Sequence, residues 1–116
     1  MEKITLETAK TGSELVLETL RDLGIDTIFG YPGGAVLPLY DAIYSLEGIQ
    51  HILGRHEQGC LHEAEGYAKS TGKLGVAVVT SGPGATNAIT GIADAMSDSV
   101  PLFVFTGPVN RAGIGK

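Results

Sequence analysis

Arg55-His56-Glu57-Gln58-Gly59 is a charged run that follows Ile49-Gln50-His51-Ile52-Leu53, a short β-rich segment ended by a glycine. Beyond the run, apolar side chains recur at helical spacing as far as Gly72. This pattern predicts a strand over 49–53 and a helix that begins near Glu57. Glu57 is therefore expected at a strand-to-helix junction, the edge of an α/β sheet at which ligands bind.

The segment alone supports two interpretations of Glu57. An acid in the first turn of a helix is stabilised by the positive end of the helix dipole, so Glu57 could be an ordinary solvated residue. The same position at the open edge of a sheet also suits a carboxylate that works on a ligand. Both interpretations stay open until the rest of the chain is considered.

The remaining sequence alternates between helical and strand patterns. The further predicted elements are a helix over 14–23 with Ser13 as its N-cap, a strand over 27–29, a helix over 35–45, a strand over 75–80, a helix over 85–96 and a strand over 101–105. The alternation is typical of an α/β fold, here a doubly wound parallel sheet with helices on both faces. Strand 75–80 is continuously apolar, which predicts coverage on both faces, and strand 101–105 is expected to be buried as well.

Two of the helices carry apolar residues that we expect to face inward. They are Val16, Leu20 and Leu23 in helix 14–23, and Ile89, Ile92, Ala93 and Met96 in helix 85–96. Residues 1–11 show no strong periodicity, although Ile4 and Leu6 could extend along a neighbouring element.

Composition and charge exclude several classes of function. The chain has 116 residues, of which 43% are hydrophobic, which is enough for one small domain with a single core. Its net charge of -5 and its scattered basic residues argue against nucleic-acid binding, and its apolar runs are too short to cross a membrane. The one cysteine cannot form an internal disulfide and no leader precedes the globular pattern, so we expect a cytoplasmic protein.

The glycines that follow predicted strands require a test for phosphate motifs. Gly82-Pro83-Gly84-Ala85-Thr86-Asn87 nearly matches the dinucleotide fingerprint, but Asn87 stands where Gly or Ala is needed and no acid follows about 20 residues later. Gly72-Lys73-Leu74 lacks the remainder of a P-loop. Neither phosphate motif is present.

The same run also contains potential metal ligands. His56 and Cys60 stand four residues apart with Glu57 between them, which resembles half of a zinc-protease helix. The second histidine of that motif is a cysteine, and His62 belongs to another face of the helix, so we expect no metal ligands. Cys60 is then a small core residue, and His56 caps or packs against the helix.

Four longer motifs stand in order along the chain. They are Phe29-Gly30-Tyr31-Pro32-Gly33-Gly34-Ala35, Arg55-His56-Glu57-Gln58-Gly59, Ala64-Glu65-Gly66-Tyr67-Ala68 and Thr80-Ser81-Gly82-Pro83-Gly84-Ala85-Thr86-Asn87. Together they resemble the pyrimidine-binding domain of the acetolactate synthase (acetohydroxyacid synthase) family, catalytic subunit. The resemblance covers the chain from about Gly12 to Lys116, and the segment 94–101 extends it.

The resemblance implies a thiamine diphosphate enzyme that decarboxylates pyruvate and joins the product to pyruvate or 2-oxobutyrate, in branched-chain amino-acid biosynthesis. Glu57 matches the family's catalytic glutamate. In the family this residue hydrogen-bonds N1′ of the aminopyrimidine and favours the imino tautomer that removes the proton from thiazolium C2. Mg²⁺ and FAD are the further cofactors implied for the full-length enzyme.

Other positions carry over from the same motifs. Tyr31, Pro32, Gly33 and Gly34 match the turn near the cofactor, Pro83 and Asn87 match the turn that flanks the pyrimidine, and Ala35 and Asn110 lie at positions of the substrate channel. Two residues depart from the family pattern at the channel end: Pro108 stands where Gln is common, and Asn110 where many members have Pro.

The resemblance also implies a homodimer or higher homo-oligomer, with a small regulatory subunit as a further partner. Small residues on helices are expected to allow close approach between subunits: Ala64, Ala68, Ala88 and Gly91. Residues 1–116 are expected to form only the pyrimidine-binding domain, without the middle domain and the diphosphate-binding domain. Such a piece should bind thiamine diphosphate weakly and be inactive alone.

Two alternative functions are kept. One is another thiamine diphosphate enzyme that acts on pyruvate, such as pyruvate oxidase. The other is a stand-alone nucleotide-binding or regulatory module without catalysis.

Overall fold

The computed structural model describes residues 9–116, so the expectation for Ile4 and Leu6 lies outside the described residues. The elements are α1 (Gly12–Asp22), β1 (Thr27–Gly30), η1 (Gly34–Val36), α2 (Leu37–Ser45), β2 (Gln50–Leu53), α3 (Glu57–Thr71), β3 (Gly75–Val79), α4 (Pro83–Asn87), α5 (Ile89–Ser97), β4 (Leu102–Thr106) and η2 (Arg111–Gly113), where η marks a 3-10 helix. The predicted alternation of helices and strands is confirmed.

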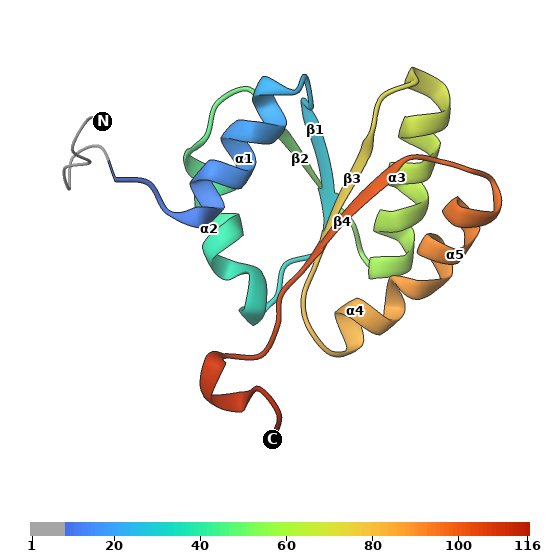
Figure 1. The fold of residues 1–116 in the computed structure, drawn as a ribbon. Helices are drawn as coiled ribbons and strands as arrows, with labels where there is room; N and C mark the ends of the chain where they lie inside the picture. Colours follow the sequence, from blue (N-terminus) through green and yellow to red (C-terminus); the bar gives the residue numbers. More distant parts are fainter. Residues whose placement is uncertain (1–8) are drawn as a thin grey trace.

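The four strands form one parallel sheet in the order β2-β1-β3-β4. Helices α1 and α2 cover one face, and α3, α4 and α5 cover the other (Figure 1). The predicted doubly wound parallel sheet is therefore confirmed. The chain steps from β1 outward to β2 and then returns to the other side of β1, so the strand order reverses between β1 and β3. Ligands bind at the carboxyl ends of the strands at such a reversal.

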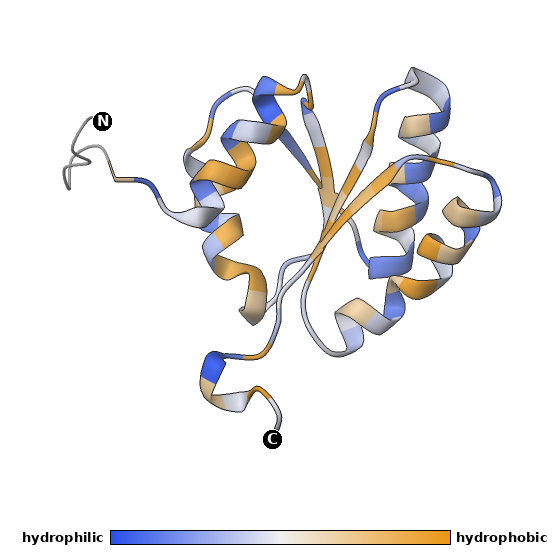
Figure 2. Ribbon diagram, in the orientation of Figure 1, coloured by the Kyte–Doolittle hydropathy of each residue, from blue (hydrophilic) through white to orange (hydrophobic). Residues whose placement is uncertain are grey.

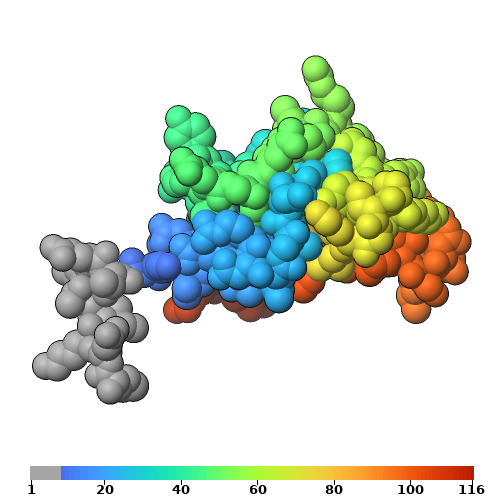
Figure 3. Space-filling view, turned by 90° about the horizontal axis from the view of Figure 1, so that it is seen from above, coloured from blue at the N-terminus to red at the C-terminus, as the bar shows by residue number. Residues whose placement is uncertain are grey.

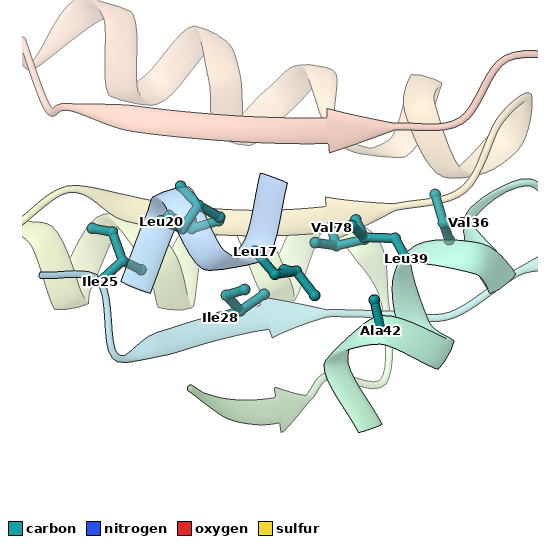
Figure 4. Close-up of a cluster of buried hydrophobic side chains, with 9 residues drawn as sticks. Leu17, Leu20, Ile25, Ile28, Val36, Leu39, Ala42 and Val78 are labelled. Carbon is teal, nitrogen blue, oxygen red and sulfur yellow. The ribbon is translucent and has the colours of Figure 1, made fainter. Parts of the chain in front are cut away.

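Strand β3 supplies both halves of the core. Val76 and Val78 point toward α1 and α2, where they pack with Leu17, Ile28 and Leu39 (Figure 4). The alternate residues Ala77 and Val79 point to the other face and pack against α3. Every residue of β3 is buried, as its continuously apolar sequence predicts.

The start of α1 differs from the prediction. Its N-cap is Thr11, not Ser13, because Thr11 Oγ1 accepts a hydrogen bond from the Glu14 amide (3.2 Å) while Glu14 Oε2 accepts one from the Thr11 amide (3.1 Å). This reciprocal capping box satisfies two backbone donors and outcompetes a lone serine cap. The buried face is Leu17 and Leu20, whereas Leu23 lies past the last turn and is 73% exposed.

The predicted helix over 85–96 is two helices, and its inward face was wrong. Gly91 and Ala95 are the buried residues of α5, whereas the four residues expected inside, Ile89, Ile92, Ala93 and Met96, are exposed. The reason is close packing against α3: a Cβ at Gly91 would overlap Leu61 Cβ. Only small side chains fit that contact, so the large apolar residues turn outward and leave hydrophobic segments on the surface of α5 (Figure 2).

The four small helix residues that were expected at a subunit interface lie inside the chain instead. Ala64, Ala68, Ala88 and Gly91 are all buried within the chain. Their size serves the approach of α3 to the sheet and to α5, so a contact between subunits has to use other residues.

Strand β4 is not a buried strand. It lies at the edge of the described sheet, and Phe103 on it is 47% exposed. Its apolar sequence indicates surface that the residues described here do not cover.

The amino end of the sheet is closed by polar contacts. Asp26, in the turn after α1, accepts hydrogen bonds from Tyr67 (2.7 Å) and Lys73 (3.3 Å). Figure 3 looks onto this end, where the light-blue turn after α1 lies against the yellow turn after α3. The carboxyl ends of the strands, where the predicted site lies, are at the opposite end of the sheet (Figure 1).

Candidate functional site at the carboxyl edge of the sheet

Glu57 is the first residue of α3, directly after the loop that leaves β2. Its N-cap is His56, whose backbone is extended and whose Nδ1 accepts a hydrogen bond from the Gln58 amide (3.1 Å). Glu57 is only 8% exposed. Because Glu57 is buried, the interpretation of this residue as a solvated first-turn acid is wrong.

Asn87 is the polar partner of Glu57. Its Nδ2 donates a hydrogen bond of 3.1 Å to Glu57 Oε2, from the last residue of α4 to the first residue of α3. The two residues come from separate sequence motifs that were both expected at the site. A buried carboxylate needs such a donor, because leaving it without one costs a large desolvation penalty.

The turn after β3 passes over the other oxygen of Glu57. A Cβ at Gly84 would lie 3.8 Å from Glu57 Oε1 and 2.8 Å from Thr80 Cγ2. Gly82, which precedes α4, has a φ of 61°, a left-handed conformation that favours glycine. The Gly82-Pro83-Gly84 sequence thus lets the backbone turn sharply and approach the carboxyl group.

Thr80 links this turn to the one after β1. A Cβ at Gly33 would fall 2.5 Å from Thr80 Cβ, so the Tyr31-Pro32-Gly33-Gly34 turn lies directly against Thr80. The Tyr31 amide donates to the Val78 carbonyl (3.1 Å), which ties the turn to β3. The structure therefore brings the two glycine-rich motifs together at the point where the strand order reverses.

The two residues assigned to a substrate channel contact the segment that follows β4. Ala35 packs against the end of β4, where a Cβ at Gly107 would lie 2.6 Å from Ala35 Cβ. Asn110 caps η2 by accepting a hydrogen bond from the Gly113 amide (2.8 Å). Among residues 9–116, the hydrogen bonds of Asn110 stay within η2 and do not reach Glu57.

A half-buried polar pair near the same edge was missed by the sequence patterns. Tyr40 OH and His51 Nε2 are 2.8 Å apart, with the rings edge to face. Burial lowers the pKa of His51 and raises the pKa of Tyr40, so both are neutral, and the tautomer of His51 determines which of the two donates. A Cβ at Gly30 would lie 2.9 Å from His51 Nε2, so the pair supports the last residue of β1. Only the position of His51 inside a short β-rich segment signals it in the sequence.

The interpretation of His56 and Cys60 as a helix cap and a core residue is confirmed. Cys60 is fully buried against Gly54, and burial raises the pKa of its thiol to about 11. His56 uses Nδ1 for the helix cap.

Comparison with known proteins identifies the class. Residues 10–116 match the model for the thiamine pyrophosphate enzyme, N-terminal TPP binding domain, and the chain belongs to this family. No helix among the described residues combines the length and apolarity that a membrane span needs.

Three similar proteins within this class are large subunits of acetolactate synthase. The chain is 72% identical to the acetolactate synthase large subunit of Lactococcus lactis over 116 residues, all of this chain and 20% of that protein. It is 60% identical to the acetolactate synthase large subunit of Haemophilus influenzae over 106 residues, 91% of this chain and 18% of that protein. It is 56% identical to the acetolactate synthase isozyme 3 large subunit of Escherichia coli over 105 residues, 90% of this chain and 18% of that protein. The chain thus spans about a fifth of the length of these relatives.

Proposed function

We propose that this chain is the pyrimidine-binding part of an acetolactate synthase and that Glu57 is its catalytic glutamate. The observation that carries the proposal is the buried Glu57 carboxyl, held by Asn87 at the carboxyl edge of the sheet. The names of relatives more than 50% identical to the chain support the activity.

The residues at this edge fit the aminopyrimidine ring of thiamine diphosphate. A buried carboxyl group suits a ring nitrogen, because a ring nitrogen and a carboxyl group can share one proton. Gly34 and Gly82 leave open space where a side chain would begin, next to the two turns that flank the reversal of strand order. Planar aromatic rings need backbone approach of this kind.

Each residue then has a distinct task. Glu57 holds a proton at N1′ of the pyrimidine ring, and Asn87 fixes the orientation of the Glu57 carboxyl. Pro83 and the turn 31–34 would border the bound ring. When bound, thiamine diphosphate supplies the nucleophilic carbon and the electron sink for 2-oxoacid decarboxylation.

The wider features of the proposal belong to the longer protein. We propose pyruvate as the donor, pyruvate or 2-oxobutyrate as the acceptor, Mg²⁺ and FAD as further cofactors, and a cytoplasmic homo-oligomer. The words "large subunit" in the names of the relatives support a small subunit as a partner. Ala35 and Asn110 remain proposed channel residues, and residues 1–116 remain the proposed extent of the pyrimidine-binding domain.

The test is product analysis with the full-length protein that carries this sequence. The protein is incubated with pyruvate, thiamine diphosphate, Mg²⁺ and FAD, and acetolactate is measured as acetoin after acid decarboxylation. Acetolactate as the main product is the expected result. Acetyl phosphate in the presence of phosphate and oxygen would assign the chain to the pyruvate oxidase alternative instead.

Calorimetry separates the non-catalytic alternative. The full-length protein is titrated with thiamine diphosphate and Mg²⁺, and separately with NAD and with ATP. We expect saturable heat only with thiamine diphosphate. Binding of NAD or ATP without binding of thiamine diphosphate would favour the nucleotide-binding module.

A further inference from the structure

Three potential metal ligands meet between α3 and α5, away from the edge that holds Glu57. His62 Nδ1 lies 3.2 Å from Glu65 Oε1 and 3.9 Å from Asp94 Oδ2. All three ligand atoms lie within 4.8 Å of one another. His62 and Glu65 are three residues apart on one face of α3, and Asp94 comes from the facing side of α5.

Glu65 is a buried carboxylate aimed into this cluster. Its side chain is 4% exposed, and His62 Nδ1 lies within hydrogen-bond distance of Glu65 Oε1. A Cβ at Gly91 would lie 3.4 Å from Glu65 Oε1, so α5 covers the carboxylate directly. Two carboxyl groups that face each other are stabilised either by a proton, because burial and Asp94 raise the pKa of Glu65, or by a cation.

Lys69 is the lysine that follows on α3, but its ammonium group pairs with another acid. Lys69 follows Glu65 by one turn of α3, but its Nζ donates to Asp98 Oδ2 at 2.9 Å. The cluster therefore has an imidazole and two carboxyl groups, and its negative charge is offset by a bound proton or by a cation from outside the chain.

The His62 ring turns Nδ1 toward the two carboxyl groups. Its Nε2 lies 3.4 Å from the side-chain amide of Gln58, one turn earlier on α3, which leaves Nδ1 toward the carboxylates. The Gln58 amide nitrogen faces Nε2, and a half-turn of the amide places its oxygen there instead, where it accepts a hydrogen bond from Nε2 and leaves the Nδ1 lone pair for a metal. A metal-bound histidine usually has its second ring nitrogen held in this way.

We propose that His62, Glu65 and Asp94 bind a divalent transition-metal ion of the zinc class, which ties α3 to α5 with water in the remaining coordination position. Zinc binds imidazole nitrogen and carboxylate oxygen at about 2.0–2.2 Å, which places tetrahedral ligands roughly 3.3–3.5 Å apart. The separations of 3.2 and 3.9 Å bracket that value. The Asp94 side chain is half exposed, so a small change of its rotamer can shorten the distance from His62 Nδ1 to Asp94 Oδ2.

The donor set also argues against the hard cations. Mg²⁺ and Ca²⁺ prefer sites made of oxygen atoms alone, whereas imidazole suits zinc and its neighbours. The proposed site is independent of the proposed function, because none of its three ligands contacts Glu57 or Asn87 in the hydrogen bonds of the described residues.

The experiment is zinc titration of the full-length protein after dialysis against a chelator, followed by calorimetry at pH 7.5. Asp94→Asn is the test variant, since the side chain is half exposed and its replacement should not disturb folding. Asp98→Asn is the matched control, an exposed acid at the end of the same helix that contacts Lys69. Thermal unfolding with and without zinc is measured for each protein to verify folding.

We expect saturable zinc binding in the wild type, with affinity reduced by at least about tenfold in Asp94→Asn and unchanged in Asp98→Asn. The zinc-dependent rise in Tm should disappear in Asp94→Asn alone. Absence of saturable zinc binding in the wild type would overturn the proposal. So would equal zinc affinity in the two variants, because the bound ion would then lie elsewhere in the protein.

Discussion

Asn87 Nδ2 donates a 3.1 Å hydrogen bond to Glu57 Oε2, across 30 positions of sequence. The bond joins the helix that follows β3 to the helix that follows β2, and it fixes one oxygen of a buried carboxyl group. The second oxygen is left on the side of the Gly84 turn. The pair thereby sets the orientation in which Glu57 can meet a ligand at the edge of the sheet.

Asn87→Ala should lower the free energy of unfolding by about 1–3 kcal/mol, because the buried Glu57 carboxylate loses its donor. Denaturant unfolding measures the change. Thr90→Ala, an exposed substitution in the next helix, is the control and should alter stability by about 0.5 kcal/mol or less. Equal effects of the two substitutions would mean that the bond contributes nothing to stability.

Gly91→Ala should destabilise the chain by about 1–3 kcal/mol, because the new methyl group overlaps Leu61 where α5 packs on α3. Gly66→Ala is the matched control. A Cβ at this exposed position of α3 meets no atom within 4 Å, so alanine should stabilise the helix by about 0.5–1 kcal/mol. Thermal or urea unfolding of both variants checks the opposite signs, and a stabilised Gly91→Ala would refute the packing.

His51 should make the chain lose stability as the pH falls below about 6.5, the ordinary pKa of histidine. Burial lowers the pKa of His51 in the folded state, so the unfolded chain takes up the proton at a higher pH than the folded chain does. Proton uptake by the unfolded chain lowers the free energy of unfolding. Above that pH both states are neutral and the effect vanishes. The free energy of unfolding of wild type and His51→Gln is compared between pH 8 and pH 5.5, with a flatter profile expected for the variant. Parallel profiles would contradict the shift.

The sequence predicts the fold class because each element has its own period and its own end signal. Strand β3 shows this most clearly, since its continuously apolar run is possible only for a strand covered on both faces. Gly72 likewise ends α3 with a φ of 72°, where the pattern places the end of the helix.

The predictions that were wrong concern positions at which packing against another element determines which residues are buried, or at which a second residue determines the helix cap. The outward turn of Ile92 and Met96 depends on the close contact of Gly91 with α3, and helical spacing alone cannot choose between two faces that both contain apolar residues. The cap at Thr11 depends on a reciprocal bond with Glu14 that a lone N-cap signal does not reveal.

The candidate site was partly predictable. Glu57 and Asn87 were both named from motifs, but the bond between them depends on how α3 and α4 meet, which no local pattern encodes. The Tyr40 and His51 pair was missed for the same reason, since its partners come from α2 and β2. The proposed metal ligands were missed because Asp94 reaches His62 only through the packing of α5.

The central claim is that Glu57 holds a proton at N1′ of bound thiamine diphosphate. Gln keeps the size of the side chain and can hydrogen-bond, but it cannot exchange a proton with the ring. Glu57→Gln should therefore bind the cofactor nearly as well as the wild type while the rate of proton transfer falls by roughly 10²- to 10⁴-fold. Glu63→Gln, an exposed acid on the same helix, is the control and should behave as the wild type.

The decisive measurement is exchange of the thiazolium C2 proton of bound cofactor in deuterated water, followed by NMR in the full-length wild type, Glu57→Gln and Glu63→Gln. The account predicts slow exchange in Glu57→Gln alone, with cofactor binding retained. Exchange in Glu57→Gln that keeps pace with the wild type would contradict it, and Glu57 would then be a buried structural acid at the start of α3.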